Sequence, residues 1–149
     1  MLLPPIYDDT YFMKKALEQA QIAYEKDEVP VGAVVVVGNR IIGRGHNSTE
    51  LLSDVTAHAE IIAMTAAAQH LGGKYLKDCT LYVSLEPCAM CAGAMYWFQL
   101  SKLVFAASDL QRGFMKNNAQ LHPKTTIQNG LLAEEASELL KQFFKQKRG

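Results

Sequence analysis

The sequence lacks both an excess of charge of one sign and any long hydrophobic run. Fifteen lysine and arginine residues balance fifteen aspartate and glutamate residues, so the formal net charge is zero. Attraction to nucleic acid must therefore come from the placement of charges, not from their sum. No apolar stretch approaches membrane-spanning length, and Met1–Pro5 is too short for the apolar part of a signal peptide. We expect neither membrane association nor a signal peptide.

Cysteine is also scarce, and its pattern is not that of a disulfide-stabilised protein. The chain contains three cysteines, an odd number, and two of them are spaced C-x-x-C. A secreted disulfide framework would need paired cysteines in larger number. The pattern favours metal-bound thiolates in a reducing compartment, and we expect a cytoplasmic protein.

No linker, repeat or low-complexity stretch divides the 149 residues. This length suffices for one compact domain with a real core and leaves little room for a second. Hydrophobic residues make up 49% of the chain and charged residues 20%, which is typical of folded globular proteins. We therefore expect residues 1–149 to form a single domain.

The apolar periodicity predicts alternating helices and strands. Helical spacing or helix-start signals predict four helices, over residues 8–26, 56–71, 87–98 and 133–147. Short apolar runs predict strands at residues 33–37, 41–47, 80–84, 103–106 and 125–127, the first two forming a hairpin. This order implies a partly parallel sheet with helices on both faces.

Local signals refine the helix ends. Thr56 is the expected N-cap of the second helix, and Gly72-Gly73 is its expected stop. Pro87 is expected in the first turn of the third helix, where its missing N–H costs nothing. In the last helix, Leu139, Leu140, Phe143 and Phe144 are expected to face inward.

Two short segments carry the candidate chemistry, Thr56-Ala57-His58-Ala59-Glu60 and Glu86-Pro87-Cys88-Ala89-Met90-Cys91. His58, Cys88 and Cys91 are three zinc ligands by type, whereas a closed structural site takes four. A three-ligand zinc site leaves a position for water and lowers the pKa of that water towards neutrality. Glu60 is close enough in sequence to carry the proton. The pattern predicts a zinc hydrolase.

The spacing is compatible with one metal. Cys88 and Cys91 are three residues apart and share a helix face. His58 and Glu60 are two residues apart, so both can face the metal only at the start of a helix. Helix N-termini carry partial positive charge, which favours thiolate over thiol.

Each motif also has a simpler interpretation. An isolated C-x-x-C can be a redox pair or half of a structural zinc site, and the chain could then be a non-catalytic, zinc-stabilised RNA-binding or redox module. Such a module would not need Glu60. His46, His70 and His122 have no spacing that recommends any of them as a fourth ligand, and Cys79 is expected to be a buried apolar group.

H-x-E combined with P-C-x-x-C is the signature of the zinc nucleobase deaminases. From about Thr10 to Arg148, the chain resembles the bacterial tRNA-specific adenosine deaminases of the zinc-dependent cytidine/deoxycytidylate deaminase superfamily. Further matching segments extend this resemblance beyond the metal motifs. They are Val29-Pro30-Val31-Gly32-Ala33-Val34, Gly45-His46-Asn47, Thr80-Leu81-Tyr82-Val83 and Gly130-Leu131-Leu132-Ala133-Glu134-Glu135.

This resemblance implies a three-layer α/β/α cytidine-deaminase-like fold with a mixed sheet of about five strands. It also implies a homodimer with one Zn²⁺ per subunit that converts adenosine to inosine at the wobble position of a tRNA anticodon. The resemblance further implies that Glu60 is the proton shuttle and that the Ala59 backbone N–H donates a hydrogen bond to the developing oxygen. It also implies that Asn47 hydrogen-bonds the base and that Asp109 contacts a neighbouring ribose. Lys141, Lys145, Lys147 and Arg148 would contact tRNA phosphates, or else form a solvated helix face.

Two positions depart from the expected family pattern. Tyr96-Trp97-Phe98-Gln99 stands where His-Ser-Arg is expected, and Ser108 stands where arginine is expected. Tyr96-Trp97 is similar to the guanine deaminases of the same superfamily. The alternative substrate is therefore a free guanine or a cytosine-type base or nucleoside, deaminated by the same zinc chemistry.

Overall fold

The computed structural model describes residues 6–149, and Met1–Pro5, on which the expectation of no signal peptide rests, lies outside the described residues. Within residues 6–149, none of the helices combines the length and apolar character needed to cross a bilayer. The helices and strands alternate along the chain in the order α1 (Asp9–Glu25), β1 (Gly32–Val37), β2 (Arg40–His46), α2 (Ala59–Leu71), β3 (Thr80–Leu85), α3 (Ala89–Phe98), β4 (Lys102–Ala107), β5 (Thr126–Asn129) and α4 (Ala133–Lys147).

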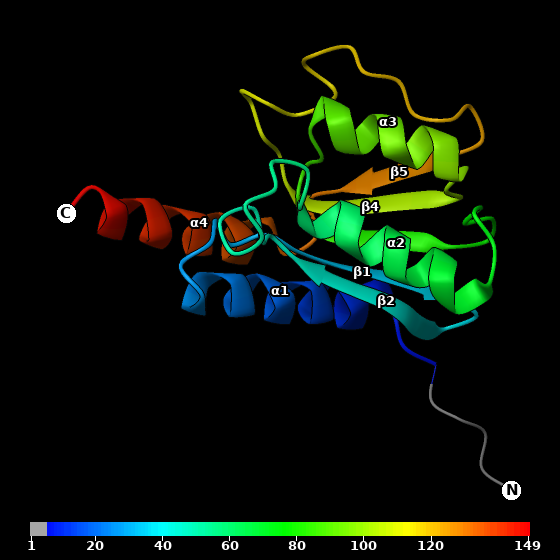
Figure 1. Cartoon of the computed structure of the whole chain (residues 1–149), viewed down its shortest axis with the longest axis horizontal. Coiled ribbons are helices and arrows are strands. Elements are labelled where there is room, and N and C mark those ends of the chain that lie inside the picture. The colour runs from blue at the N-terminus through cyan, green and yellow to red at the C-terminus, as the bar shows by residue number, and fades with distance from the viewer. Residues whose placement is uncertain (1–5) are drawn as a thin grey trace, which may run out of the picture.

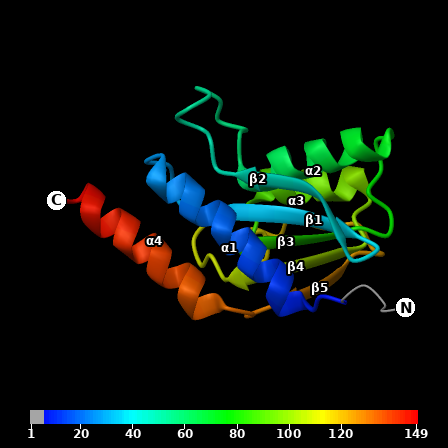
Figure 2. The ribbon, with the colours of Figure 1, turned by 90° about the horizontal axis from the view of Figure 1, so that it is seen from below.

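The strands form one mixed sheet in the order β2-β1-β3-β4-β5. The β1–β2 hairpin is antiparallel, and β1 also pairs antiparallel with β3. From β3 onward the pairing is parallel, because α3 crosses over between β3 and β4. Helices α2 and α3 cover one face, while α1 and α4 cover the other (Figures 1 and 2). The predicted three-layer α/β/α fold with a mixed five-stranded sheet is confirmed.

Each face of the sheet has its own core, because successive strand residues point to opposite sides. On β3, Leu81 and Val83 pack under α2 and α3 in a cluster that also contains Met64 and Phe105. Tyr82 points the other way, into the cluster beneath α1. The sheet is therefore buried on both sides, as a partly parallel sheet requires.

Small residues bring α2 close to the outer strand β2. Gly43 and Gly45 lie opposite Ala63 and Ala59, and a Cβ atom on Gly45 would overlap the Ala59 carbonyl oxygen. The same Cβ atom would lie 2.8 Å from the Ala63 backbone nitrogen. The N-terminal turn of α2 is thus held directly against the C-terminal end of β2.

The helix starts differ from the sequence expectation at two places. His58, not Thr56, is the N-cap residue of α2, and Thr56 instead donates hydrogen bonds from its backbone N–H and hydroxyl to Asp54 Oδ1, at 2.8 and 2.7 Å. Pro87 precedes the N-cap residue Cys88 of α3 and so lies outside its first turn. Because of the Asp54 turn and the extended backbone at His58 and Cys88, both helices begin later in the sequence than expected, at Ala59 and Ala89.

The expected burial of α4 is also wrong in part. Ala136 and Phe143 are the buried residues of this helix, whereas Phe144 is 44% exposed. The C-terminal half of α4 runs past the edge of the sheet beside α1 (Figure 2), so only a narrow stripe of it is covered.

Replacing Gly45 by alanine should lower the free energy of unfolding by about 1–3 kcal/mol, since the added methyl group overpacks the β2–α2 contact. Urea denaturation measures this change. Gly73→Ala is the matched control, because nothing lies within 4 Å of its added Cβ atom. Equal denaturation midpoints for the two variants would contradict the close packing of β2 and α2.

Candidate active site

Three potential metal ligands meet at one point of the structure. The ligand atoms of His58, Cys88 and Cys91 all lie within 4.8 Å of one another. His58 Nδ1 lies 3.7 Å from Cys88 Sγ and 3.5 Å from Cys91 Sγ. The structure thus brings together the three residues that the sequence singles out, although His58 is 30 positions before Cys88.

These distances fit a zinc ion. Tetrahedral zinc with ordinary Zn–N and Zn–S bonds holds its nitrogen and sulfur ligands about 3.5 Å apart. No fourth histidine, cysteine or carboxylate joins the group within the part of the chain that the structure describes. A three-ligand set of this kind is the arrangement of a catalytic zinc site.

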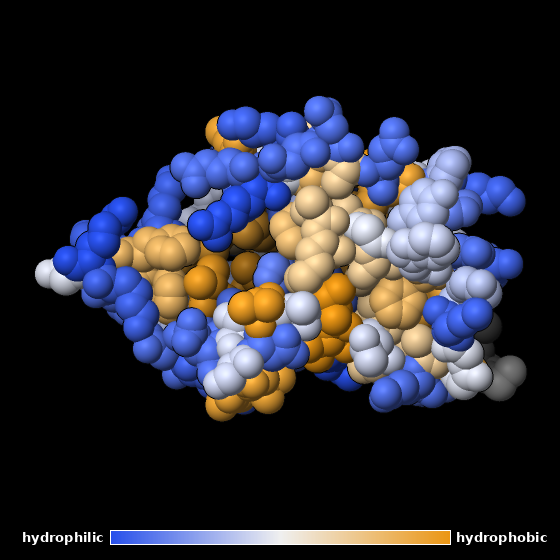
Figure 3. Space-filling view, turned by 45° about the horizontal axis from the view of Figure 1, so that its top comes forward, coloured by the Kyte–Doolittle hydropathy of each residue, from blue (hydrophilic) through white to orange (hydrophobic). Residues whose placement is uncertain are grey.

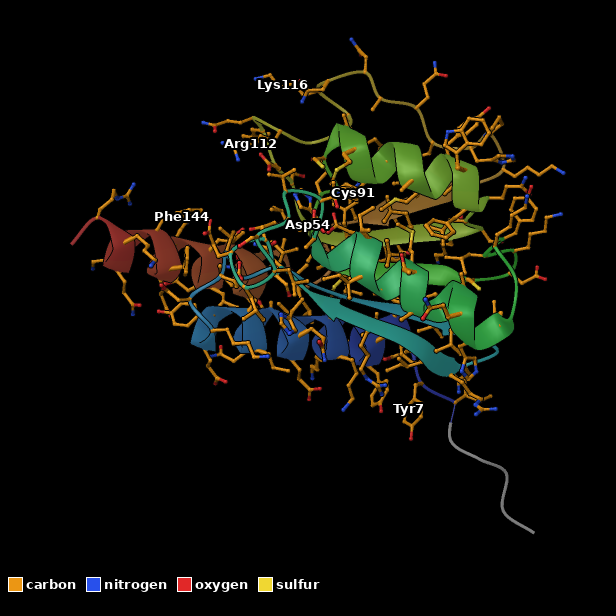
Figure 4. The ribbon with its side chains drawn as sticks, in the orientation of Figure 1. Tyr7, Asp54, Cys91, Arg112, Lys116 and Phe144 are labelled. Carbon is orange, nitrogen blue, oxygen red and sulfur yellow. The ribbon has the colours of Figure 1, made fainter. Side chains whose placement is uncertain are left out.

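Helix starts position all three ligands. His58 is the N-cap residue of α2, Cys88 is the N-cap residue of α3, and Cys91 lies in the first turn of α3. Figure 4 shows Cys91 between the adjacent starts of these two helices. The first backbone N–H groups of a helix have no intrahelical acceptor and carry partial positive charge. Both helix starts therefore stabilise negative charge on the two sulfurs.

The side chains of this group shift one another's protonation. The Cys91 thiol donates a hydrogen bond to the Cys88 sulfur and, helped by His58, lowers the pKa of Cys88 to about 4, although burial opposes this shift. The same Cys88–Cys91 hydrogen bond, together with burial, raises the pKa of Cys91. The hydrogen bond to Cys88 also raises the pKa of His58. Cys88 is thus a thiolate at neutral pH, which is the form that binds a metal.

Glu60 lies beside the ligands in the first turn of α2 and is only 4% exposed. Burial raises the pKa of its carboxyl group to about 7, and the neighbouring Cys88 adds to the rise while His58 opposes it. A carboxyl group with a pKa near neutrality can both accept and donate a proton at physiological pH. Glu60 therefore has the protonation behaviour of a general acid–base.

His58, Glu60 and Cys88 line a cavity of about 230 Å³ that opens on the face shown in Figure 3. The volume is below the range of about 300–1,000 Å³ that is common for drug-sized ligands, so the cavity suits one small ring system. Its wall contains six of the residues that the sequence predicts for the site, namely Asn47, His58, Ala59, Glu60, Cys88 and Asp109.

Asn47 offers the cavity an unused hydrogen-bond acceptor. The side chain is 8% exposed, and its Nδ2 donates to the Val29 carbonyl oxygen at 3.3 Å. Its Oδ1 is buried and has no hydrogen-bond partner among residues 6–149. Because an unpaired buried acceptor is costly, a bound ligand with an N–H or O–H group would relieve it.

The predicted phosphate-binding residues lie elsewhere. Lys141, Lys145 and Lys147 are on α4 and Arg148 follows it, and none of the four lines the cavity. Lys147 pairs with Asp27 at 2.6 Å and lines a second groove of about 600 Å³. This groove shares Val29 and Thr49 with the cavity, so the two depressions adjoin.

Sequence reasoning missed several residues of the cavity wall. Glu86 and Arg112 both line it, together with Thr49 and Leu85. The position of Glu86 directly before Pro87-Cys88 is a signal that could have identified it. Arg112 lies in an irregular loop after β4, where the sequence carries no periodicity that indicates which side chains turn inward.

Comparison with known proteins identifies the family. Residues 7–148 match the family of MafB19-like deaminases. A tRNA-specific adenosine deaminase of Aquifex aeolicus is 44% identical over 143 residues, which cover 93% of this chain and 95% of the relative. The chain belongs to the tRNA-specific adenosine deaminase family.

Solved structures agree with this assignment to the deaminases. A structure from a study of A-to-I editing by tRNA:A34 deaminases at the tRNA wobble position is 40% identical, with a TM-score of 0.81. The match covers 88% of this chain and 99% of that one. A guanine deaminase of Nitrosomonas europaea is 26% identical, with a TM-score of 0.79 over 95% of this chain and 87% of its own. Deaminases of different substrates thus share this fold.

Cys88→Ser should lose bound zinc and stability together, because metal-binding energy at such a site is partly folding energy. Zinc content by atomic absorption and thermal denaturation measure the two effects. Cys79→Ala is the control, since Cys79 is fully buried but belongs to no ligand group. A stable Cys88→Ser protein with full zinc content would refute the ligand assignment.

Proposed function

We propose that this protein is a zinc-dependent hydrolase that converts adenosine to inosine at the wobble position of a tRNA anticodon. The observation that carries the proposal is the buried Glu60 beside three potential zinc ligands, at a cavity that suits one ring system. Its relatives named for tRNA-specific adenosine deamination support the substrate.

The reaction adds water to C6 of adenine and releases ammonia. His58, Cys88 and Cys91 would hold one Zn²⁺ per subunit, which supplies Lewis acidity and lowers the pKa of water. Glu60 takes a proton from the attacking water and gives it to ring nitrogen N1. It then takes the second proton from the new hydroxyl group on C6 and gives it to the amino group, which leaves as ammonia. The Glu60 pKa of about 7 suits both directions of transfer. The Ala59 N–H, at the start of α2, donates a hydrogen bond to the oxygen that forms at C6.

The remaining predicted residues bind the nucleotide and the RNA. Asn47 Oδ1 would accept a hydrogen bond from the bound nucleoside, and Asp109 on the cavity wall would contact the ribose of a neighbouring nucleotide. Lys141, Lys145, Lys147 and Arg148 would contact phosphates, with Lys147 exchanging its pairing with Asp27 for the RNA. The target base must leave its stack to enter the cavity, which anticodon loops permit.

We also propose a homodimer in the cytoplasm. The outer surface of α3 and the loop before α2 expose large apolar side chains, with Trp97 77% and Val55 84% exposed. Apolar exposure of this kind marks protein–protein contacts. The three cysteines are free, as a reducing compartment would keep them.

Trp97→Lys should shift the protein from dimer to monomer, because it places a charge in the proposed apolar interface. Analytical ultracentrifugation measures the mass. Leu110→Lys is the control, since Leu110 is 79% exposed but lies in the loop after β4. A monomeric unmodified protein would refute the dimer.

The alternative substrate is a free base. Structural similarity to a guanine deaminase favours it, as does the sequence Tyr96-Trp97. Neither Tyr96 nor Trp97 lines the cavity, however, and both lie near the far end of α3. These residues therefore do not define a base pocket within one chain.

The test gives zinc-loaded protein an anticodon stem-loop with adenosine at the wobble position and, separately, free guanine, cytosine and adenosine. We expect inosine from the stem-loop alone, and Glu60→Gln should lower turnover at least about 100-fold with zinc and fold retained. Turnover of a free base with the stem-loop untouched would overturn the substrate. Full activity of Glu60→Gln would overturn the mechanism.

A further inference from the structure

Glu86 is a buried carboxylate that the proposed reaction does not use. It is 6% exposed, lines the cavity and lies two residues before Cys88. Among residues 6–149, no lysine, arginine or histidine forms an ion pair with it. Because a buried polar group needs hydrogen-bond partners, the partners of the Glu86 carboxyl group indicate its function.

Glu86 binds the backbone of the loop that follows β4. Its Oε1 accepts a hydrogen bond from the Asp109 N–H at 3.0 Å, and its Oε2 accepts one from the Met115 N–H at 3.0 Å. Hydrogen bonds from N–H groups to an ionised carboxylate are stronger than those to a neutral acceptor. The single side chain thus closes residues 109–115 into an anchored loop.

Close backbone packing accompanies this anchor. The Phe114 N–H donates to the Pro87 carbonyl oxygen at 2.9 Å, and the Cys88 and Gly113 backbones form an isolated bridge. A Cβ atom on Gly113 would overlap the Glu86 carboxylate, so only glycine allows this approach. The loop is therefore fixed directly to the segment that carries Cys88.

The anchored loop carries two charged residues to the cavity wall, Asp109 and Arg112. Asp109 Oδ1 accepts the N–H groups of Gln111 at 3.1 Å and Arg112 at 2.9 Å, which sets the position of Arg112 relative to Asp109. Figure 4 shows Arg112 on this loop, which lies above the start of α2. Within the described chain, Arg112 is the one lysine or arginine on the cavity wall, and its guanidinium forms no ion pair.

We propose that Glu86 is a positioning residue for substrate recognition, which holds Arg112 at the cavity rim so that its guanidinium binds a phosphate next to the target adenosine. The proposal rests on the proposed function and adds a specificity determinant to it. A free nucleoside lacks that phosphate, so this contact selects polynucleotide substrates. Guanidinium groups suit phosphate oxygens, which they bind in a bidentate manner.

The experiment is a double-mutant cycle on the zinc-loaded protein with Glu86→Gln, Arg112→Ala and the double variant. A glutamine side chain keeps one acceptor oxygen but turns an amide donor towards the second loop N–H. The dissociation constant of the wobble-adenosine stem-loop is measured by fluorescence anisotropy at salt concentrations from about 50 to about 200 mM. Over this range, an affinity that depends on phosphate contacts falls steeply. Zinc content, kcat and hydrogen exchange at the Asp109 and Met115 N–H groups complete the measurement.

Each single variant should weaken stem-loop binding about tenfold. The double variant should be weaker than either single variant by much less than a further factor of about ten, because both substitutions remove the contact of Arg112 with the phosphate. The slope of log affinity against log salt should fall by about 0.7 in each, the value for one phosphate on single-stranded RNA. Zinc content and kcat should stay unchanged, and both loop N–H groups should exchange faster in Glu86→Gln. Arg112→Lys should restore the salt slope.

Glu28→Gln is the matched control. Glu28 is 1% exposed and accepts the N–H groups of Glu50 at 3.1 Å and Leu51 at 2.7 Å, so it anchors a different loop in the same way. Its effect on affinity should add to that of Arg112→Ala and leave the salt slope unchanged.

Additive effects of Glu86→Gln and Arg112→Ala, or an unchanged salt slope, would overturn the proposal even where the loop N–H groups exchange faster. Loss of zinc in Glu86→Gln with normal affinity per zinc-loaded molecule would also overturn it, in favour of a structural role. An unmodified protein that neither binds nor deaminates the stem-loop would refute the proposed function, and this proposal with it.

Discussion

The structure depends on one constraint, which is that three ligand atoms from distant parts of the chain must meet within 4.8 Å. The starts of α2 and α3, on the same face of the sheet, satisfy this constraint, because His58 and Cys88 are their N-cap residues. The close contact of Gly45 with Ala59 holds the first of these starts, and the parallel pairing of β3 with β4 places the second. The fold thus determines the geometry of the site before any ligand binds.

Three buried carboxylates lie in this site or in the groove beside it, which is unfavourable unless each has a compensating partner. Glu28 and Glu86 are each compensated by two backbone N–H groups of a loop that borders the site. Among residues 6–149, no pair of loop N–H groups donates to Glu60, and burial raises the pKa of its carboxyl group to about 7. Glu28 and Glu86 therefore hold the loops beside the cavity, while Glu60 remains free to exchange a proton.

The sequence predicted the order of helices and strands, the hairpin and the grouping of His58, Cys88 and Cys91, because periodicity and ligand spacing are local signals. It did not predict that Thr56 would serve a turn with Asp54 instead of capping α2, since both interpretations use the same hydroxyl. Nor did it predict Glu86 and Arg112, because the loop after β4 owes its shape to contacts with residues more than twenty positions away. The roles assigned to Asn47, Ala59 and Asp109 stay predictions, although all three line the cavity.

The most direct test of the account follows the oxygen atom in the reaction. Zinc-loaded protein is incubated with the wobble-adenosine stem-loop in water enriched in oxygen-18, and the nucleosides are analysed by mass spectrometry. Hydrolytic deamination with Glu60 as proton carrier predicts inosine with one oxygen-18 atom at position 6, and almost none from the Glu60→Gln protein. Inosine without the label, or equal labelled product from both proteins, would contradict the account.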